Sequence, residues 1–319
     1  MRVLIITRFY KNGQTTHVAD LCAELIRQGH QVMLVITQLH DPIYVQWLNA
    51  RRILYLTTSD PRKLYKHLVE WQPDIIHNHS AHTLAATIDL GQHLQVRTLT
   101  TVHYLDFEPR ELLQEQSAVV LISEEMKAFF SNLSVPTFVV ENGVNIPLPN
   151  HFRKPWQKRA LILAQVTAEK EENFRRISRD LLDWGWKVTS AGNWRFKGVK
   201  HLGWVNDVWP LLKQADLVVG TGRAIREGMA ANSAVWILGT YSDGLVTPEN
   251  VELLRQTNFS GRTSKREYCS QSASGDLKDP SIERLQALGN FGRQYASEHF
   301  SSKKMAEKLA LIYKGILES

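Results

Sequence analysis

The chain alternates short apolar segments with amphipathic segments from its first residues onward. Residues 2–7 read as a buried strand, residues 16–28 carry apolar side chains at helical spacing, and residues 32–36 read as the next strand. A strand, a helix and a second strand in this order form the repeating unit of a parallel sheet. The sequence therefore predicts an α/β fold.

The alternation lapses over residues 145–157, which contain three prolines and no periodicity, and then restarts. This pattern predicts two doubly wound, Rossmann-like domains that face each other across a cleft, joined by a linker. We expect an N-terminal domain over residues 1–148, a C-terminal domain over residues 158–300 and a closing helix over residues 301–319. Residues 264–279 are polar, and we expect a loop there.

Composition limits the class of protein. The 319 residues are 43% hydrophobic and 22% charged, as in a soluble globular chain. The net charge of +6 suits an anionic substrate, an anionic membrane surface or nucleic acid without choosing among them. Cys22 and Cys269 have no metal-binding spacing, which favours a reducing, cytoplasmic setting. The apolar runs are short, so we expect neither a signal peptide nor a membrane span.

Residues 216–231, with the sequence DLVVGTGRAIREGMAA, combine an apolar strand, a glycine turn and a helix. Gly220 and Gly222 lack Cβ atoms, so the turn that they form with Thr221 lets the backbone approach a ligand closely. The helix that follows presents its N-terminal N–H groups and the positive end of its dipole. This arrangement predicts an anion site, and phosphate is its usual ligand.

Charged side chains near this turn fit a nucleotide diphosphate. Arg223 could bind phosphate through two N–H groups. Glu227, one turn inside the helix, could accept hydrogen bonds from ribose hydroxyls, although a surface glutamate near a helix N-terminus would also be ordinary. Lys170 could neutralise a diphosphate as a point charge, and a solvated lysine is the alternative.

Two loops of the N-terminal half carry further candidates. Gly13 would let the backbone approach an anionic group just before a helix that the threonines at 15–16 could cap, although a plain turn explains this loop too. A second loop contains His77, His79 and His82. Because neither cysteine nor carboxylate accompanies these histidines, we do not expect a metal site.

The remaining candidates border the expected cleft. His103 ends an apolar strand, where an imidazole could orient or stabilise a polar substrate or could simply be hydrogen-bonded at the rim. Asn142 opens an Asn-Gly turn at the domain junction, and a tight turn explains it adequately. We assign His79, Tyr104 and Asn142 to the acceptor side or to the cleft.

Taken together, these segments resemble the retaining glycosyltransferases of the GT-B fold, family 4 in particular. The resemblance is carried by the opening MRVLIITRFYKNGQTTHVADLCAELIRQGHQV, by TTVHYLDF and ENGVNIP, and by VKHLGWVNDVWPLLKQADLVV and GTGRAIREGMAANSAVWILG. It implies an N-terminal acceptor domain, a C-terminal nucleotide-sugar domain and a closing helix that packs back on the first domain. It also implies transfer of a sugar with retention of configuration, without a cofactor or a catalytic metal.

The resemblance assigns roles to individual residues. Gly13 matches the first-strand loop near the donor phosphate, and His103 matches a histidine that contacts the donor sugar. Lys170 matches the phosphate-binding lysine, and Glu227 matches the glutamate that holds the ribose. We expect His103 and Glu227 to carry the chemistry. The expected donor site also contains Gly220, Thr221, Gly222 and Arg223.

Three departures from the family pattern matter. Val219 stands where the first glutamate of a paired motif is usual, and Gln165 replaces an arginine before the phosphate lysine. Only Gly13 remains of a double glycine in the first loop. Arg223 could restore the missing positive charge. These departures make a catalytically inactive carbohydrate- or nucleotide-binding protein an alternative, and a nucleotide-sugar epimerase is another.

The resemblance also suggests partners and a setting. The donor would be a nucleotide-diphosphate sugar, with a UDP-sugar favoured and a GDP-sugar as the alternative. The acceptor would be a glycan, a lipid-linked molecule or a protein in bacterial cell-surface glycan synthesis. We expect a cytoplasmic protein, with peripheral contact at the inner face of the membrane as an option. A nucleic-acid partner is not expected, because no aromatic-basic motif is present. A dinucleotide dehydrogenase is disfavoured, because Ile225 stands where its third glycine would fall.

Overall fold

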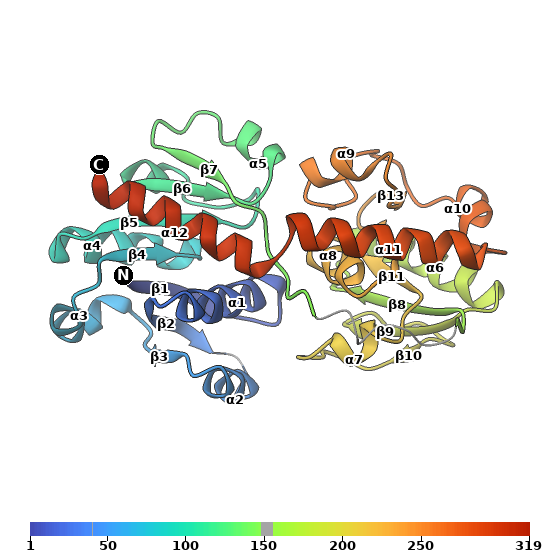
Figure 1. Cartoon of the computed structure of the whole chain (residues 1–319), viewed down its shortest axis with the longest axis horizontal. Coiled ribbons are helices and arrows are strands. Elements are labelled where there is room, and N and C mark those ends of the chain that lie inside the picture. The colour runs from blue at the N-terminus through green and yellow to red at the C-terminus, as the bar shows by residue number, and fades with distance from the viewer. Residues whose placement is uncertain (40, 148–155) are drawn as a thin grey trace. The chain divides into compact units, whose positions relative to one another are not determined.

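The structure is a computed structural model that describes residues 1–39, 41–147 and 156–319. It consists of two compact units (Figure 1). Unit 1 contains residues 1–143 and 302–319, and unit 2 contains residues 144–301. Each unit has a sheet of mainly parallel strands with helices on both faces, so the predicted α/β architecture of two doubly wound domains is confirmed. Most of the predicted linker, residues 148–155, lies outside the described residues.

Unit 1 is built on a seven-stranded sheet in which all strand pairs are parallel. Its strands are β1 (Arg2–Phe9), β2 (Gln31–Leu39), β3 (Leu54–Thr57), β4 (Ile75–Asn78), β5 (Arg97–Val102), β6 (Ala118–Leu121) and β7 (Thr137–Val139). The strand order is β3-β2-β1-β4-β5-β6-β7. Successive strands are added toward one edge of the sheet from β1 to β3 and toward the other edge from β4 to β7, so the strand order reverses between β1 and β4.

Helices cover both faces of this sheet. They are α1 (Gly13–Arg27), α2 (Ile43–Ala50), α3 (Tyr65–Trp71), α4 (Leu84–Leu94), α5 (Glu124–Phe129) and α12 (Ser302–Glu318). Successive residues of a strand point to opposite faces. Accordingly, Val3 and Ile5 of β1 join a core with α1, α2 and α12, while Leu4 and Ile6 join a core with α3 and α4.

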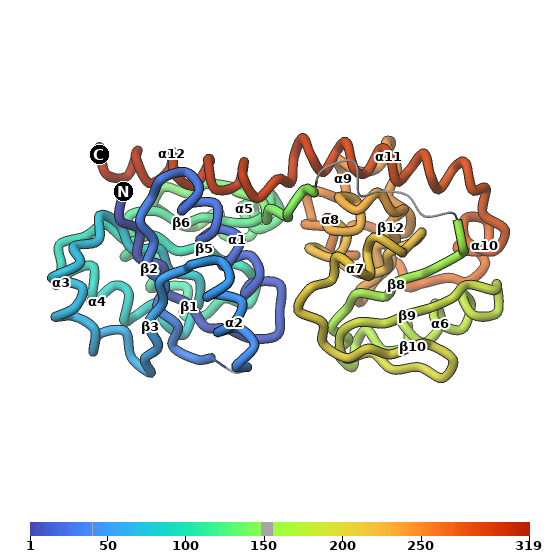
Figure 2. The backbone as a smooth tube through the Cα atoms, turned by 60° about the horizontal axis from the view of Figure 1, so that its bottom comes forward, coloured from blue at the N-terminus to red at the C-terminus, as the bar shows by residue number. Residues whose placement is uncertain are grey.

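The C-terminal helix α12 is an integral part of unit 1, where it lies beside α1 (Figure 2). One face of α12 is buried, and Met305, Leu309 and Tyr313 belong to the same core as β1 and β2. The Tyr313 hydroxyl lies 2.6 Å from His77 Nδ1 of β4. The last helix of the chain therefore completes the core of the unit that the first residues begin.

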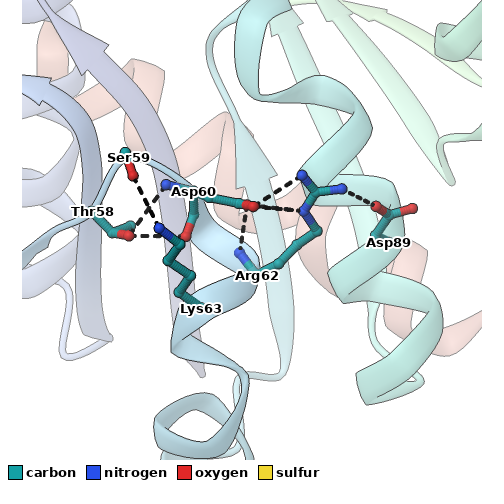
Figure 3. Close-up of polar contacts among 6 residues, drawn as sticks. All are labelled: Thr58, Ser59, Asp60, Arg62, Lys63 and Asp89. Atoms are coloured by element: carbon teal, nitrogen blue, oxygen red, sulfur yellow. Dashed lines mark hydrogen bonds and ion pairs between the residues drawn. The ribbon is translucent and has the colours of Figure 1, made fainter.

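The segment before α3 shows how local chemistry starts a helix (Figure 3). Asp60 caps a 3₁₀ turn over Pro61–Leu64 by accepting a hydrogen bond from the Arg62 N–H at 3.0 Å. The Arg62 guanidinium then forms ion pairs with Asp60 at 2.9 Å and with Asp89 of α4 at 3.0 Å. A proline is well suited to this first position because its missing N–H has no partner there.

Unit 2 is built on a six-stranded sheet with the order β10-β9-β8-β11-β12-β13. Its strands are β8 (Arg159–Ala164), β9 (Lys187–Gly192), β10 (Lys200–His201), β11 (Leu217–Gly220), β12 (Ala234–Leu238) and β13 (Ser242–Leu245). All strand pairs are parallel except the pair of β12 with the edge strand β13. The strand order of this sheet reverses between β8 and β11.

The helices of unit 2 are α6 (Glu171–Asp183), α7 (Trp209–Leu212), α8 (Arg223–Ala230), α9 (Val251–Gln256), α10 (Ser270–Leu277) and α11 (Ile282–His299). Val218 packs in a core with α8, α9 and α11, while Leu217 and Val219 pack in a core with α6 and α10. No helix in the described part of the chain is long and apolar enough to span a bilayer.

Two local expectations were wrong, and one strand was missed. The expected loop at residues 264–279 contains α10, whose Ala273 and Leu277 are buried in the core. Helix α1 begins at Gly13 instead of residue 16, because Asn12 caps it by accepting a hydrogen bond from the Thr15 N–H at 3.0 Å. The edge strand β13, which pairs antiparallel to β12, was not predicted.

Candidate functional site

Each sheet has one point where its strand order reverses. In doubly wound sheets, ligands bind beyond the carboxyl ends of the strands at this point. In unit 1 the loops after β1 and β4 flank it, and in unit 2 the loops after β8 and β11 do. The sequence-predicted residues fall at both of these edges, and each edge is described within its own unit.

In unit 2, two glycines make the turn between β11 and α8 possible. A Cβ on Gly220 would lie 2.5 Å from the Leu163 carbonyl oxygen of β8 and 2.9 Å from Ala224 Cβ. Gly222, the residue before the helix, has a φ of 54°, which disfavours any residue with a side chain. The predicted strand, glycine turn and helix are therefore present, packed directly against the neighbouring strand.

Not every N–H group of the turn can serve an anion. The Gly222 N–H donates to the Phe259 carbonyl oxygen at 2.9 Å, and the Ala224 N–H donates to the Thr221 carbonyl oxygen at 3.1 Å. The expected cradle of turn N–H groups is therefore partly occupied by the protein itself. A phosphate at this edge would depend more on side chains than the sequence suggested.

Arg223 and Glu227 form an ion pair on the first turns of α8. Arg223 Nε lies 2.7 Å from Glu227 Oε1, and the two side chains are only 14% and 9% exposed. Glu227 is therefore not the solvated surface glutamate that was the alternative at this position. The pair sets a guanidinium donor and a carboxylate acceptor side by side next to the glycine turn.

Sequence analysis missed Arg226, which is completely buried in unit 2. One of its terminal nitrogens, Nη1, donates to Asn258 Oδ1 at 2.5 Å, and its guanidinium lies over the rings of Phe259 and Phe300, 5.1 and 4.7 Å from their centroids. An arginine is rarely buried unless it is paired, so the sequence alone gave no reason to assign it a core position. Arg226 therefore connects α8 to the segment that follows α9, through its hydrogen bond to Asn258 and its packing on Phe259.

Asparagines, also missed, hold the neighbouring loops. Asn193, after β9, exchanges two hydrogen bonds of 2.7 and 2.8 Å with the backbone of Val166, after β8. Asn173 on α6 donates to the Thr240 carbonyl oxygen, after β12, at 2.8 Å. These contacts fix the loops that follow β8, β9 and β12. The glycine turn after β11 lies at the same edge of the sheet, because Gly220 of β11 pairs with Leu163 of β8.

Lys170 ends a 3₁₀ turn over Ala168–Lys170 in the loop that follows β8. Its backbone N–H donates to Thr167, and its ammonium group has no ion-pair partner among the described residues. Because β8 and β11 are neighbours, this loop shares its sheet edge with the glycine turn. Lys170 is therefore a cation with capacity for a ligand.

In unit 1, three histidines from different elements come together. They are His17 of α1, His79 directly after β4 and His103 directly after β5, and all three are buried. His79 Nδ1 lies 3.1 Å from His103 Nε2. The ring centroid of His17 lies 4.9 Å from that of His103 and 5.4 Å from that of His79.

This cluster differs from the three histidines that the sequence placed in one loop. His77 is fully buried and holds Tyr313 and Thr101, whose hydroxyls lie 2.6 and 2.7 Å from its two ring nitrogens. His82 is exposed. The His77 ring lies next to that of His79, with 4.0 Å between centroids, but both of its nitrogens are engaged. His17, which sequence analysis did not single out, joins His79 and His103 in the cluster instead.

Burial also sets the charge of these rings. It lowers the pKa of His77 and of His103 to about 3, and it lowers the pKa of His79 well below its ordinary value. A buried imidazole gives up the hydration that stabilises its charged form, so the neutral form is favoured. These three rings are therefore neutral at pH 7.

The other predicted residues of unit 1 are distributed along the same sheet. Gly13 is the first residue of α1, and the preceding Asn12 donates from Nδ2 to the Tyr104 hydroxyl at 3.3 Å. Tyr104, next to His103, is 47% exposed. Asn142, three residues after β7, has a buried Oδ1 with no hydrogen-bond partner among the described residues. The segments that follow β1, β4 and β5 thus contain Gly13, His79, His103 and Tyr104. Asn142 follows β7, the edge strand of this sheet.

Residues 11–147 match the family model described as Glycosyltransferase Family 4, which covers less than half of the chain. No curated protein matches the sequence. Among solved structures, Alr3699/HepE from Anabaena in complex with UDP and glucose is similar, with 15% identity, a TM-score of 0.73, and 99% of this chain and 100% of that chain covered.

Two further structures extend the likeness. A glycosyltransferase from Rickettsia africae has a TM-score of 0.70 at 16% identity, with 100% of this chain and 99% of that chain covered. S. aureus MnaA with UDP has a TM-score of 0.62 at 14% identity, with 97% and 95% covered. At such identities the likeness establishes the fold. Together with the family match over residues 11–147, it confirms the predicted resemblance to GT-B glycosyltransferases of family 4.

Proposed function

We propose that this chain is a glycosyltransferase that moves a sugar from a nucleotide-diphosphate donor to an acceptor hydroxyl with retention of configuration. A UDP-sugar is the favoured donor, because the similar Alr3699/HepE was solved with UDP, with UDP-glucose, and with UDP and glucose. A GDP-sugar is the alternative. The acceptor would be a glycan, a lipid-linked molecule or a protein used in bacterial cell-surface glycan synthesis, reached from the cytoplasmic side of the membrane.

The observation that carries the proposal is the Arg223–Glu227 pair at the head of α8, beside the glycine turn and at the reversal point of the unit 2 sheet. The two side chains pair with each other, and a nucleoside diphosphate would engage both, because phosphate accepts from a guanidinium and ribose hydroxyls donate to a carboxylate. Lys170, on the neighbouring loop, adds a second positive charge.

In the proposed reaction the bond between the sugar and the diphosphate breaks through an oxocarbenium-like state. Arg223 and Lys170 stabilise the charge that develops on the departing phosphate. The acceptor hydroxyl attacks from the same face, and the leaving phosphate takes its proton. We assign His103, a neutral ring in unit 1, to the donor sugar and Gly13 to the donor phosphate. We assign His79, Tyr104 and Asn142 to the acceptor side or to the cleft. No step needs the pair of carboxylates that glycoside hydrolases use, and we propose that none needs a metal.

A catalytically inactive binding protein is a second candidate. Val219, where a sugar-contacting glutamate would be usual, is a fully buried residue of β11 and packs in the sheet core. Gln165 is exposed and neutral where an arginine would be usual. Both features would weaken donor activation while leaving nucleotide binding intact. An epimerase is less well supported, because it needs several acid–base groups around the sugar, and His103 is the one group that we assign to the donor sugar.

The test measures binding and turnover on the full chain. We would titrate UDP, GDP, ADP and CMP by calorimetry and thermal shift, with and without Mg²⁺, on wild type and on Glu227→Gln. The matched control is Glu267→Gln, a glutamate of the same unit whose side chain is 75% exposed. A nucleotide at about 100 times its dissociation constant should stabilise the fold by about 2.7 kcal/mol.

We expect one diphosphate to stabilise wild type and Glu267→Gln without Mg²⁺, and the effect to be lost in Glu227→Gln. Turnover of the matching sugar donor, with the product's anomeric configuration read by NMR, then separates the transferase from the inactive binding protein. Failure of every nucleotide to bind wild type would overturn the donor-site assignment and the proposed function with it. An inverted product would overturn the retaining mechanism alone.

A further inference from the structure

The cluster of His17, His79 and His103 has the composition of a transition-metal site. Each histidine offers one ring nitrogen, and the three nitrogens lie within 4.8 Å of one another. We propose that this cluster binds a divalent transition-metal ion, with Zn²⁺ as the natural candidate, and that the bound ion inhibits the protein. The binding site stands on the geometry of unit 1 alone, and only the inhibition rests on the proposed function.

The spacing is close to that of a formed site. Zn²⁺ binds histidine nitrogens at about 2.0–2.1 Å in tetrahedral geometry, which sets two ligand nitrogens about 3.4 Å apart. His79 Nδ1 and His103 Nε2 already lie 3.1 Å apart. The third nitrogen belongs to His17, whose ring lies edge-on to that of His103. Because the three nitrogens lie within 4.8 Å of one another, a side-chain movement of at most about 1.4 Å would bring the His17 nitrogen to the spacing of a formed site.

Burial also prepares the rings for ligation. All three are buried, and burial favours the neutral imidazole, whose lone pair a metal takes.

The scaffold holds each ligand from a different element. His79 is anchored by its backbone N–H, which donates to the Ile6 carbonyl oxygen of β1 at 2.9 Å, and its own carbonyl oxygen accepts from the Gln14 side chain on α1. His17 lies one turn farther along the same helix. His103 follows β5, the neighbour of β4. Ligands on such rigid elements keep their positions without the ion.

The ligand set also selects the kind of ion. Imidazole nitrogen favours Zn²⁺, Cu²⁺, Ni²⁺ and Co²⁺ over Mg²⁺ and Ca²⁺, which take oxygen ligands. The three-residue cluster contains neither thiolate nor carboxylate. Because nothing in it offsets the charge of the ion, we expect reversible binding, weaker than in structural zinc sites that use cysteine.

Inhibition follows from the use of one shared residue. In the proposed reaction His103 contacts the donor sugar, and a ring bound to Zn²⁺ cannot also make that contact. The ion would therefore compete with productive binding of the donor sugar. Chelation should reverse the effect, because the ion joins a site that the fold builds without it.

The experiment uses the full chain after treatment with EDTA and dialysis. Zn²⁺ binding is measured by calorimetry, and Co²⁺ binding by the visible absorption of tetrahedral Co²⁺. We expect one ion per chain. His17→Gln and His79→Gln should each weaken binding by about 100-fold or more, since loss even of an outer-shell partner costs about 10–100-fold. The exposed His82, in the same loop as His79, provides the control His82→Gln, which should bind as wild type does.

Circular dichroism checks that the variants fold. Should they not, copper-catalysed oxidation of wild type by ascorbate, mapped by mass spectrometry, should modify His17, His79 and His103 and spare His82. Absence of binding to wild type, binding that survives both substitutions, or oxidation at other histidines would overturn the metal site.

The inhibition has its own readout. Zn²⁺ should reduce donor turnover by wild type, and it should not change the turnover of His17→Gln relative to that variant's own metal-free rate. If Zn²⁺ binds the three histidines but no donor is turned over with or without it, the metal site stands and the proposed function fails. If turnover is present and Zn²⁺ does not bind, the metal site alone fails.

Discussion

Arg223 Nε and Glu227 Oε1 lie 2.7 Å apart on the first turns of α8, and both side chains are largely buried. A buried ion pair is weak evidence for stability, because the cost of removing two charges from water can exceed the attraction between them. We therefore assign this pair to the proposed donor site and not to a stabilising role. The predictions below begin with this pair and then test the surrounding fold.

We predict that Arg223→Gln weakens binding of the nucleoside diphosphate by about 10-fold or more. A hydrogen bond to a charged group contributes about 1.5–3 kcal/mol, and 1.4 kcal/mol is a factor of ten in affinity. Calorimetric titration with UDP measures the change. Arg175→Gln is the matched control, because Arg175 forms an exposed pair with Glu171 on α6 and should not affect binding. Equal affinities for the two variants would contradict the assignment of Arg223.

We predict that Gly220→Ala destabilises unit 2 by about 1–3 kcal/mol, the usual result of overpacking. The new Cβ would lie 2.5 Å from a backbone oxygen of β8, which cannot move without disturbing the sheet. The control is Gly275→Ala in α10, where no atom lies within 4 Å of the new Cβ. That change should stabilise the helix by about 0.5–1 kcal/mol. Urea unfolding gives the free energy of unfolding of each variant, and hydrogen exchange on unit 2 peptides shows whether that unit is destabilised by Gly220→Ala and stabilised by Gly275→Ala.

We predict that Tyr313→Phe destabilises unit 1 by about 1–3 kcal/mol, because His77 Nδ1 would lose its partner in a fully buried position. Hydrogen exchange read by mass spectrometry on peptides of β1 and β4 reports this unit specifically. Tyr65→Phe removes a hydroxyl from a side chain that is 40% exposed, and it should change stability by less than about 0.5 kcal/mol. A similar effect of both changes would mean that the contact with His77 contributes nothing.

We predict opposite behaviour for two leucines of α12. Leu309 is 1% exposed in the unit 1 core, and Leu309→Ala should cost about 2–5 kcal/mol. Leu311 is 68% exposed on the other side of the helix, and Leu311→Ala should stay within about 0.5 kcal/mol of wild type. The same exchange measurement on unit 1 peptides checks both. A mild effect of Leu309→Ala would show that α12 is dispensable for that core.

Local patterns predicted the parts of this molecule that depend on periodicity. The apolar run at Leu217–Val219, the two glycines and the helix after them all appear where the sequence placed them. The expected loop around α10 failed because only two residues of that helix, Ala273 and Leu277, are buried, too few to produce a visible apolar stripe.

Contacts between distant segments could not be predicted in the same way. His17 lies 62 residues from His79 in the sequence, and they meet because β1 and β4 are neighbours in the sheet. Arg226 looks like a surface cation in the sequence, and only the rings of Phe259 and Phe300 reveal its buried environment. Sequence analysis found the loops that form the edges of the two sheets, and the strand order decided which side chains meet there.

Unit 1 is interrupted in the sequence, because residues 144–301 form unit 2 before α12 returns to complete the first core. This order has a consequence for biosynthesis. A ribosome releases the strands of unit 1 before unit 2, yet the helix that covers their apolar face leaves the exit tunnel only after unit 2. The nascent chain must carry an unfinished unit 1 while unit 2, continuous in sequence, can already fold. Unit 1 is therefore begun before unit 2 and completed after it.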